Sequence, residues 1–242
     1  DDGAPNDWHV MHLGRLAIGG CGIVFGEETA VEPEGRKTYA CAGMYKPSHI
    51  KAYQRLTDLI KANGAIPAIQ LGHSGRKGSC HGAIENWRPL APADAADGLP
   101  PWQVMAPTAN NCPPRPIKPK EMDRDDIKHV IEAFRTATKM SLDAGYEIVE
   151  IHGAHGYLIH QFLSSTSNRR TDGYGGSLEN RMRFAIEIAA VVRATWPQDK
   201  PVFFRLSAVD GKGGSWNLAE SIELAKALKQ VEIDIIDVSS GG

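Results

Sequence analysis

The sequence has few cysteines and contains no C-x-x-C motif. Only four cysteines are spread over 242 residues. Their scarcity and wide spacing exclude both a zinc ribbon and the dense disulfide framework of a small secreted domain. We therefore expect reduced thiols in a cytoplasmic protein at Cys21, Cys41, Cys80 and Cys112.

The sequence also lacks a charge excess and a long hydrophobic run. Lys and Arg number 27 against 29 Asp and Glu, which leaves a net charge of -2 and no basic surplus for nucleic acid or an anionic membrane surface. No stretch approaches the ~20 apolar residues that a membrane-spanning helix needs. Residues 1–5 are polar and turn-like, so we expect no signal peptide. These absences predict a protein that binds neither nucleic acid nor membrane.

What the sequence does contain is a series of short apolar runs. They are rich in Val, Ile or Phe and lack polar alternation, which is typical of parallel strands buried on both faces. The chain length suits a (β/α)8 barrel, which typically has about 250 residues. Five such runs occur, at residues 22–25, 66–71, 147–152, 201–206 and 233–238.

Helical patterns with recognisable ends separate these runs. Strands and helices in alternation predict parallel crossover units, and therefore the α/β class. The residues expected to begin the helices are Ser48, Asp123, Ser177 and Asn217, the last with Glu220 as a capping-box variant.

One long segment interrupts this alternation. Residues 72–122 hold nine of the chain's fifteen prolines, and a loop of this length in a compact domain usually forms a lid or an active-site wall. No internal repeat and no shift in composition marks a second domain. We therefore expect a single domain over residues 1–242.

The expected carboxyl ends of the five strands are polar. In a parallel barrel these ends face a common site, and a buried polar group without a partner costs about 1–3 kcal/mol. A ligand explains such a concentration of polar groups better than packing does. The polar ends are residues 27–29, 70–76, 152–157, 205–207 and 237–242.

His152 and His155 form the most informative pair, because they follow a strand at positions i and i+3. They could be metal ligands, but a catalytic metal needs a third protein ligand, and His160 is the only other histidine nearby. They could be structural histidines with satisfied hydrogen bonds. They could also be paired donors that polarise a substrate oxygen, with the Tyr157 phenol as proton donor.

Arg205 and Gln70 are polar residues within apolar strands. A buried guanidinium needs an anionic partner, which could be a ligand that becomes negative during turnover or an acid such as Glu150. Gln70 offers an amide donor and a carbonyl acceptor, which suit either the edge of a heterocycle or the backbone of a neighbouring loop. The residues alone leave these alternatives open.

Several blocks of the sequence together resemble the old yellow enzyme family, the FMN-dependent ene-reductases. A string of matches that covers nearly all of the chain is far more specific than a single short motif. The matching blocks are Trp8-His9 with His12 to Gly14, Glu27 with Thr29 to Val31, Gly35-Arg36, Gln70 to Lys77, Glu150 to Leu158 with Gln161 to Ser164, and several residues from Asn168 to Arg181.

The resemblance implies a (β/α)8 barrel with FMN at the carboxyl ends of its strands. It implies that Gln70 binds the pyrimidine edge of the flavin and that Arg205 lies beside flavin N1 and the C2 oxygen. It also implies that the backbone of Glu28 contacts the flavin. The Glu28 side chain, at a position where many relatives have a small residue, must then turn away from the ring.

For the substrate, the resemblance implies that His152 and His155 hold the carbonyl oxygen of an α,β-unsaturated compound. Tyr157 would deliver a proton after NAD(P)H-reduced FMN has transferred hydride, in a protein that can be a homo-oligomer. The alternatives are an iron–sulfur flavoprotein of the dienoyl-CoA reductase or amine dehydrogenase type, a non-catalytic fragment that cannot hold FMN, and a metal-dependent barrel hydrolase.

The number of strands leads to an expectation about completeness. Five runs against eight barrel strands, with a first residue other than Met, predict that barrel strands 2–6 are present and that strands 1, 7 and 8 are missing. We therefore expect an internal fragment, truncated at both ends, with open apolar sheet edges and weak FMN binding by itself.

Overall fold

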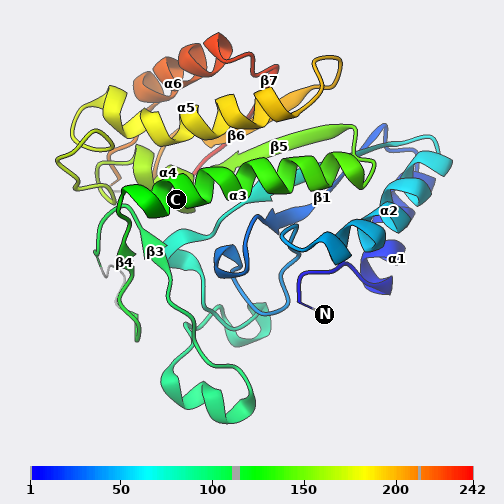
Figure 1. The fold of residues 1–242 in the computed structure, drawn as a ribbon, viewed down its shortest axis with the longest axis horizontal. Helices are drawn as coiled ribbons and strands as arrows, with labels where there is room; N and C mark the ends of the chain where they lie inside the picture. The colour runs from blue at the N-terminus through cyan, green and yellow to red at the C-terminus, as the bar shows by residue number, and fades with distance from the viewer. Residues whose placement is uncertain (1, 111–114, 212–213, 242) are drawn as a thin grey trace.

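Five parallel strands form the central sheet of the protein (Figure 1). The structure is a computed structural model that describes residues 2–110, 115–211 and 214–241. The five predicted strands and the α/β class are confirmed, and the sheet order β1-β2-β5-β6-β7 follows the order of these strands in the chain. The strands are β1 Ile23–Ala30, β2 Ile66–Gly72, β5 Ile148–Gly153, β6 Val202–Ser207 and β7 Ile235–Ser239.

Strand β1 is longer than the sequence predicts, because it continues through Glu27 and Glu28 to Ala30. Its pairing with β2 shifts at a bulge between Phe25 and Glu28, after which Glu28 lies opposite Gln70. The hydrophobic pattern stops at the first charged residue, whereas backbone pairing does not depend on side-chain charge. The bulge thereby brings Glu28 to the polar edge of the sheet.

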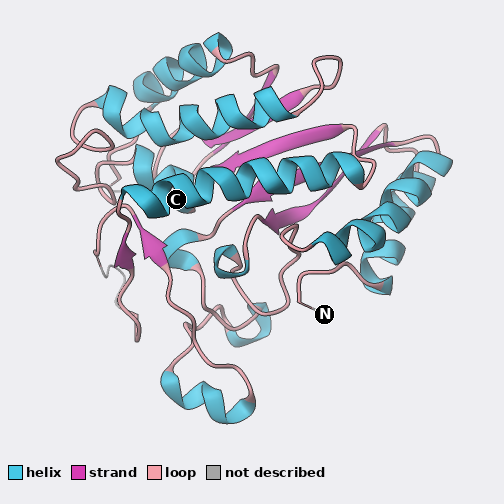
Figure 2. Ribbon diagram, in the orientation of Figure 1, coloured by secondary structure: helices cyan, strands magenta, loops and turns pink. Residues whose placement is uncertain are grey.

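Helices connect the strands and pack around the sheet (Figure 2). The four predicted helices are confirmed, although Ser48 does not cap α2, which begins at Pro47 with Lys46 at its N-cap. The sequence patterns do not predict α1 or the short α4. Helix α1 buries only Leu13, Gly14 and Ala17, so its amphipathic pattern is weak. No described helix is both long and apolar enough to cross a membrane. The helices are α1 Asp7–Ile18, α2 Pro47–Ala62, α3 Arg124–Asp143, α4 Leu158–Leu163, α5 Leu178–Thr195 and α6 Leu218–Gln230.

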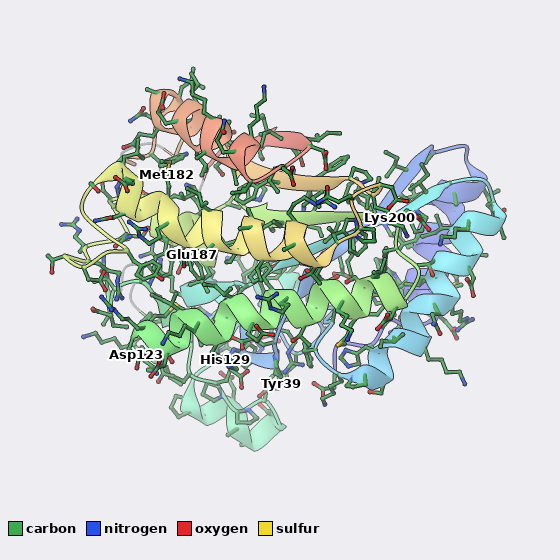
Figure 3. The ribbon with its side chains drawn as sticks, turned by 45° about the horizontal axis from the view of Figure 1, so that its top comes forward. Tyr39, Asp123, His129, Met182, Glu187 and Lys200 are labelled. Carbon is green, nitrogen blue, oxygen red and sulfur yellow. The ribbon has the colours of Figure 1, made fainter. Side chains whose placement is uncertain are left out.

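The caps of three helices follow the sequence, with one correction. The Asp123 carboxylate accepts two backbone N–H groups at the start of α3 (Figure 3), and Ser177 caps α5. Asn217 caps α6, but the capping-box role predicted for Glu220 is wrong. Its carboxylate instead lies 2.5 Å from the guanidinium of Arg181 on α5, because a charge-assisted hydrogen bond is stronger than one to a neutral amide.

The two faces of the sheet differ in chemistry. Alternate residues of each strand point to opposite faces, and those that face the helices belong to the hydrophobic core, as do Leu71, Ile151 and Phe204. The other face carries the polar residues. In register across neighbouring strands lie Glu28, Gln70 and Glu150, then His152, Arg205 and Asp237, and then Ser207 and Ser239.

The proline-rich segment between β2 and α3 projects from the body of the molecule (Figure 1). It forms short 3-10 helices and the two-residue strands β3 Met105–Ala106 and β4 Lys120–Glu121. Arg88 pairs with Asp94 and lies 2.7 Å from His81, which gives the segment its own polar contacts.

Three of the four cysteines lie within the described residues. Cys21, Cys41 and Cys80 are free thiols, whereas Cys112 lies outside the described residues.

Gly153 marks a close approach between β5 and β6. A Cβ atom at this position would lie 2.4 Å from the ring of Phe204. Since the buried ring has no free space to move into, we expect Gly153→Ala to lower the free energy of unfolding by about 1–3 kcal/mol. Urea denaturation measures this change, with Gly22→Ala as the matched control because none of the described residues places an atom within 4 Å of its Cβ position. Equal effects of the two substitutions would contradict the packing argument.

Candidate functional site

Strands β1, β2 and β5 contribute the carboxylate of Glu28, the amide of Gln70 and the carboxylate of Glu150 to the polar edge. Gln70 is buried and donates from Nε2 to the Oε2 atom of Glu150 over 2.5 Å. Burial raises the pKa of Glu150, and the hydrogen bond from Gln70 opposes that rise. The side chain of Glu28 turns to form an ion pair with Lys37. The Gln70 amide therefore presents only part of its hydrogen-bonding capacity to a ligand.

Arg205 has a different partner from the one that the sequence suggested. Its Nε atom lies 3.0 Å from Oδ2 of Asp237 on β7, with both side chains partly exposed. Glu150 is not the partner, because its register position on β5 is opposite Phe203 and its carboxylate accepts from Gln70. The Nε atom is buried and makes no hydrogen bond of acceptable geometry within the described residues. The guanidinium is thus held at the polar edge by charge and is not saturated by hydrogen bonds.

The structure brings His152, His155 and Tyr157 together after β5. Nε2 of His152 lies 3.3 Å from Nδ1 of His155. The Tyr157 ring centroid lies 5.2 Å from that of His152 and 6.5 Å from that of His155. His155 continues the chain of contacts, with Nε2 at 2.6 Å from the hydroxyl of Ser239 on β7. Two imidazoles and a phenol therefore converge at one end of the sheet.

A left-handed turn gives the histidine pair its direction. His155 has φ of +59° and the following Gly156 has φ of +69°, a region that costs a non-glycine residue about 1 kcal/mol or more. Three contacts hold the turn. The His155 N–H donates to the Ser207 hydroxyl over 2.9 Å, the Gly156 N–H donates to His160 Nδ1 over 2.8 Å, and the Lys77 ammonium donates to the His155 carbonyl over 2.6 Å.

Asp210 supports this turn through His160. Its Oδ1 atom lies 2.8 Å from His160 Nε2, and its Oδ2 atom accepts from the Ser164 hydroxyl over 2.6 Å. Burial raises the pKa of Asp210, but the hydrogen bonds from His160 and Ser164 outweigh burial and leave the pKa below its usual value. The sequence patterns missed Asp210 because it lies in the loop after β6. His160, which the sequence offers as a third metal ligand, instead accepts from the Gly156 N–H and contacts Asp210.

The histidine pair is neutral near pH 7. Burial is the main reason why the pKa of His152 falls to about 2, and the charges of Lys37 and Arg205 add to the decrease. Burial and Arg205 also lower the pKa of His155. Because the Ala154 N–H donates weakly to Nδ1 of His152 over 3.4 Å, the single proton of the neutral ring lies on Nε2. That N–H faces Nδ1 of His155 at 3.3 Å, and the oxygen atom of a ligand could replace this acceptor.

Tyr157 keeps its proton at the same pH. Burial raises the pKa of its phenol, while the ammonium of Lys37 opposes the rise. Within the described ranges, no group of three or more His, Cys, Asp or Glu residues is placed to hold a metal ion. The metal alternative for His152 and His155 therefore gains no support. What the residues can do is donate hydrogen bonds to an oxygen atom and supply a proton beside it.

A family model described as NADH:flavin oxidoreductase / NADH oxidase matches residues 1–242. The chain belongs to this family. It is 39% identical over 241 residues to the NADPH dehydrogenase of Geobacillus sp. (strain WCH70), a match that covers 100% of this chain and 64% of that protein. The chain thus spans less than two thirds of the length of this NADPH dehydrogenase.

Solved structures of similar proteins show the same fold. A 2-naphthoyl-CoA reductase in complex with 2-naphthoyl-CoA has a TM-score of 0.86 and 32% identity, and the match covers 99% of this chain and 36% of that one. The old yellow enzyme homologue of Zymomonas mobilis has a TM-score of 0.83 and 24% identity, and the match covers 100% of this chain and 66% of that one. The family model and the NADPH dehydrogenase match confirm the resemblance to the old yellow enzyme family, and the two solved structures show that the fold is shared.

Burial of neutral His152 predicts a pH dependence of stability. In the unfolded chain a histidine has a pKa near 6.5, whereas the folded protein keeps the ring neutral down to about pH 2. The unfolded state therefore binds the additional proton as pH falls below 6.5, and each further pH unit costs about 1.4 kcal/mol of stability.

Urea denaturation between pH 6.5 and 5 tests this expectation, since most carboxylates titrate below that range. His152→Asn should lose less stability than the wild-type protein over the same range. The exposed His12 provides the matched control, His12→Asn, which should keep the wild-type slope. An unchanged slope in His152→Asn would show that burial does not keep this ring neutral.

Proposed function

We propose that the protein containing this chain is an FMN-dependent oxidoreductase that takes hydride from NAD(P)H and reduces the activated C=C bond of α,β-unsaturated carbonyl compounds. The observation that carries the proposal is the convergence of neutral His152, neutral His155 and protonated Tyr157 at the carboxyl end of β5. The family and the NADPH dehydrogenase relative support the use of flavin and NAD(P)H.

The residues at the polar edge fit a flavin. A flavin pyrimidine edge offers donors and acceptors to the amide of Gln70, which lies beside β1 and β5. Reduced flavin gains negative charge on the same edge, where a fixed cation stabilises it, and the buried Nε atom of Arg205 makes no hydrogen bond with the residues that the structure describes. Glu28 keeps its side chain on Lys37, so its backbone remains the part that can contact the ring. When bound, FMN would supply the hydride.

The chain's own residues would bind and activate the substrate. The N–H groups of His152 and His155 donate to the carbonyl oxygen and stabilise the negative charge that develops on it when hydride reaches the β-carbon. Neutral rings suit this role, because burial has already removed their charge. Tyr157, half-buried and protonated, donates a proton to the α-carbon.

A second candidate is reduction of an unsaturated acyl-CoA by an iron–sulfur flavoprotein. The structural similarity to 2-naphthoyl-CoA reductase favours it. A thioester carbonyl can accept from the same histidines, so the geometry of the pair suits both substrates. Iron and acid-labile sulfide in the complete protein would favour this candidate over a protein that contains FMN alone.

Anaerobic stopped-flow spectroscopy tests the proposal on the complete, FMN-loaded protein. We expect NADPH to bleach the flavin absorbance and 2-cyclohexenone to restore it. In His155→Ala the oxidative step should slow by about 100-fold or more, as when one donor to a developing oxyanion is removed, whereas His12→Ala should behave as the wild type. If no enone, nitroalkene or unsaturated thioester reoxidises the flavin, the proposed activity is lost.

The role proposed for Arg205 has a readout independent of turnover. Removal of its charge in Arg205→Met should disfavour reduced flavin and lower the two-electron reduction potential by about 30 mV or more, which corresponds to about 1.4 kcal/mol. Arg205→Lys, which retains the charge, should recover part of this loss. Spectroelectrochemical titration measures all three potentials, and identical values would exclude Arg205 from the flavin site.

A further inference from the structure

A cavity of about 460 Å³ lies beside the histidine pair. Its volume is in the range of pockets that hold a small ligand. Tyr157 is common to the cavity and to the proposed active site, so a molecule in the cavity can reach both. The cavity is lined by Lys37, Lys77, Cys80, Trp87, Arg115 and Tyr157.

The lining of this cavity has a positive excess. The ammonium groups of Lys37 and Lys77 lie 5.2 Å and 5.6 Å from the centre of the Tyr157 ring, and Arg115 adds a guanidinium. Lys37 is neutralised by its ion pair with Glu28. Lys77 donates to the neutral carbonyl of His155 and has no carboxylate as ion-pair partner in the described part of the chain.

The environment of Lys77 favours an anionic partner. Loss of hydration lowers the pKa of its ammonium, and the neighbouring charge of Arg76 lowers it further. Both effects destabilise the cation, and an anion at hydrogen-bond distance would reverse them. Because the His155 carbonyl uses one of three N–H donors, the ammonium has donors left for a ligand.

One of the residues that line the cavity is an exposed aromatic residue. Trp87 is 51% exposed, and both Trp87 and the preceding Asn86 have left-handed backbone, with φ of +55° and +53°. Such a conformation costs a bulky residue more than it costs glycine. The proline-rich segment thus holds a flat apolar surface at the cavity that contains the lysines.

We propose that the substrate carries an oxyanion group in addition to its α,β-unsaturated carbonyl. In this arrangement Lys77 binds the oxyanion in the cavity, while His152 and His155 hold the carbonyl oxygen and Trp87 covers the apolar part of the molecule. The proposal rests on the proposed function. The oxyanion can be a carboxylate of a small unsaturated keto acid or a phosphate of an acyl-CoA.

Matched pairs of substrates isolate the charge. On the FMN-loaded complete protein, 4-oxocyclohex-2-ene-1-carboxylate is compared with its methyl ester, and crotonyl-CoA with neutral S-crotonyl-pantetheine. We expect at least about a ten-fold higher kcat/KM for the anionic member of one pair, the effect of one charge-assisted hydrogen bond. The pair that shows the preference identifies the source of the oxyanion.

Variants then assign the preference to Lys77. The preference is the kcat/KM value for the anionic substrate divided by that for its neutral partner. In Lys77→Met this ratio should fall about ten-fold, and Lys77→Arg should restore much of it. The exposed Lys51 on α2 gives the matched control, Lys51→Met, which should keep the wild-type ratio. Calorimetric titration with the saturated keto acid and its methyl ester provides a binding readout that does not depend on turnover.

The outcomes separate this inference from the proposed function. If neutral and anionic members of both pairs are reduced equally well, the oxyanion proposal is wrong while the reductase activity stands. The same holds if Lys77→Met and Lys51→Met change the ratio alike. If none of the four compounds, and no simple enone, reoxidises the flavin, the proposed function fails, and calorimetry alone decides whether the cavity binds anions.

Discussion

The candidate site depends on the register between β5 and β6. This register sets His152 beside Arg205 and Gly153 beside Leu206, and the next pair of strands adds Asp237. A shift by one residue would turn every side chain of a strand to the opposite face. Arg205 would then point at the hydrophobic core between sheet and helices, and Phe204 would occupy the polar edge. Close packing of Gly153 against Phe204 opposes such a shift.

Concentration of polar groups at one edge has an energetic cost, and the structure offsets it locally. Gln70 contacts Glu150, His152 contacts His155, and His155 reaches Ser239. Each group is thereby satisfied in part, whereas buried groups without partners would cost about 1–3 kcal/mol each. The contacts are between side chains and not within the backbone ladder, so a ligand with matching donors and acceptors can replace some of them without a change in the fold.

Much of the architecture could be predicted from the chain. Buried parallel strands appear in the sequence as unbroken apolar runs, and helix starts are marked by Asp, Ser or Asn. The predicted bounds of strands and helices therefore agree with the structure to within a few residues, except at the bulge of β1. The polar strand ends pointed to Gln70, His152, His155, Tyr157 and Arg205 as one group, because parallel strands end at the same edge. Helix α1 was not predicted, since only three of its residues are buried.

The sequence by itself determined which chemical groups follow each strand and, through the order of strands and helices, that these groups meet. Tertiary structure alone decided their partners. Arg205 pairs with Asp237 and not with Glu150, because strand register and not residue type selects the neighbour. Lys37 comes from the connection between β1 and α2, whereas Lys77 and Trp87 come from the segment between β2 and α3, and these residues line one cavity with Tyr157. Charge and burial in that cavity arise from three-dimensional packing, which no periodicity along the chain encodes.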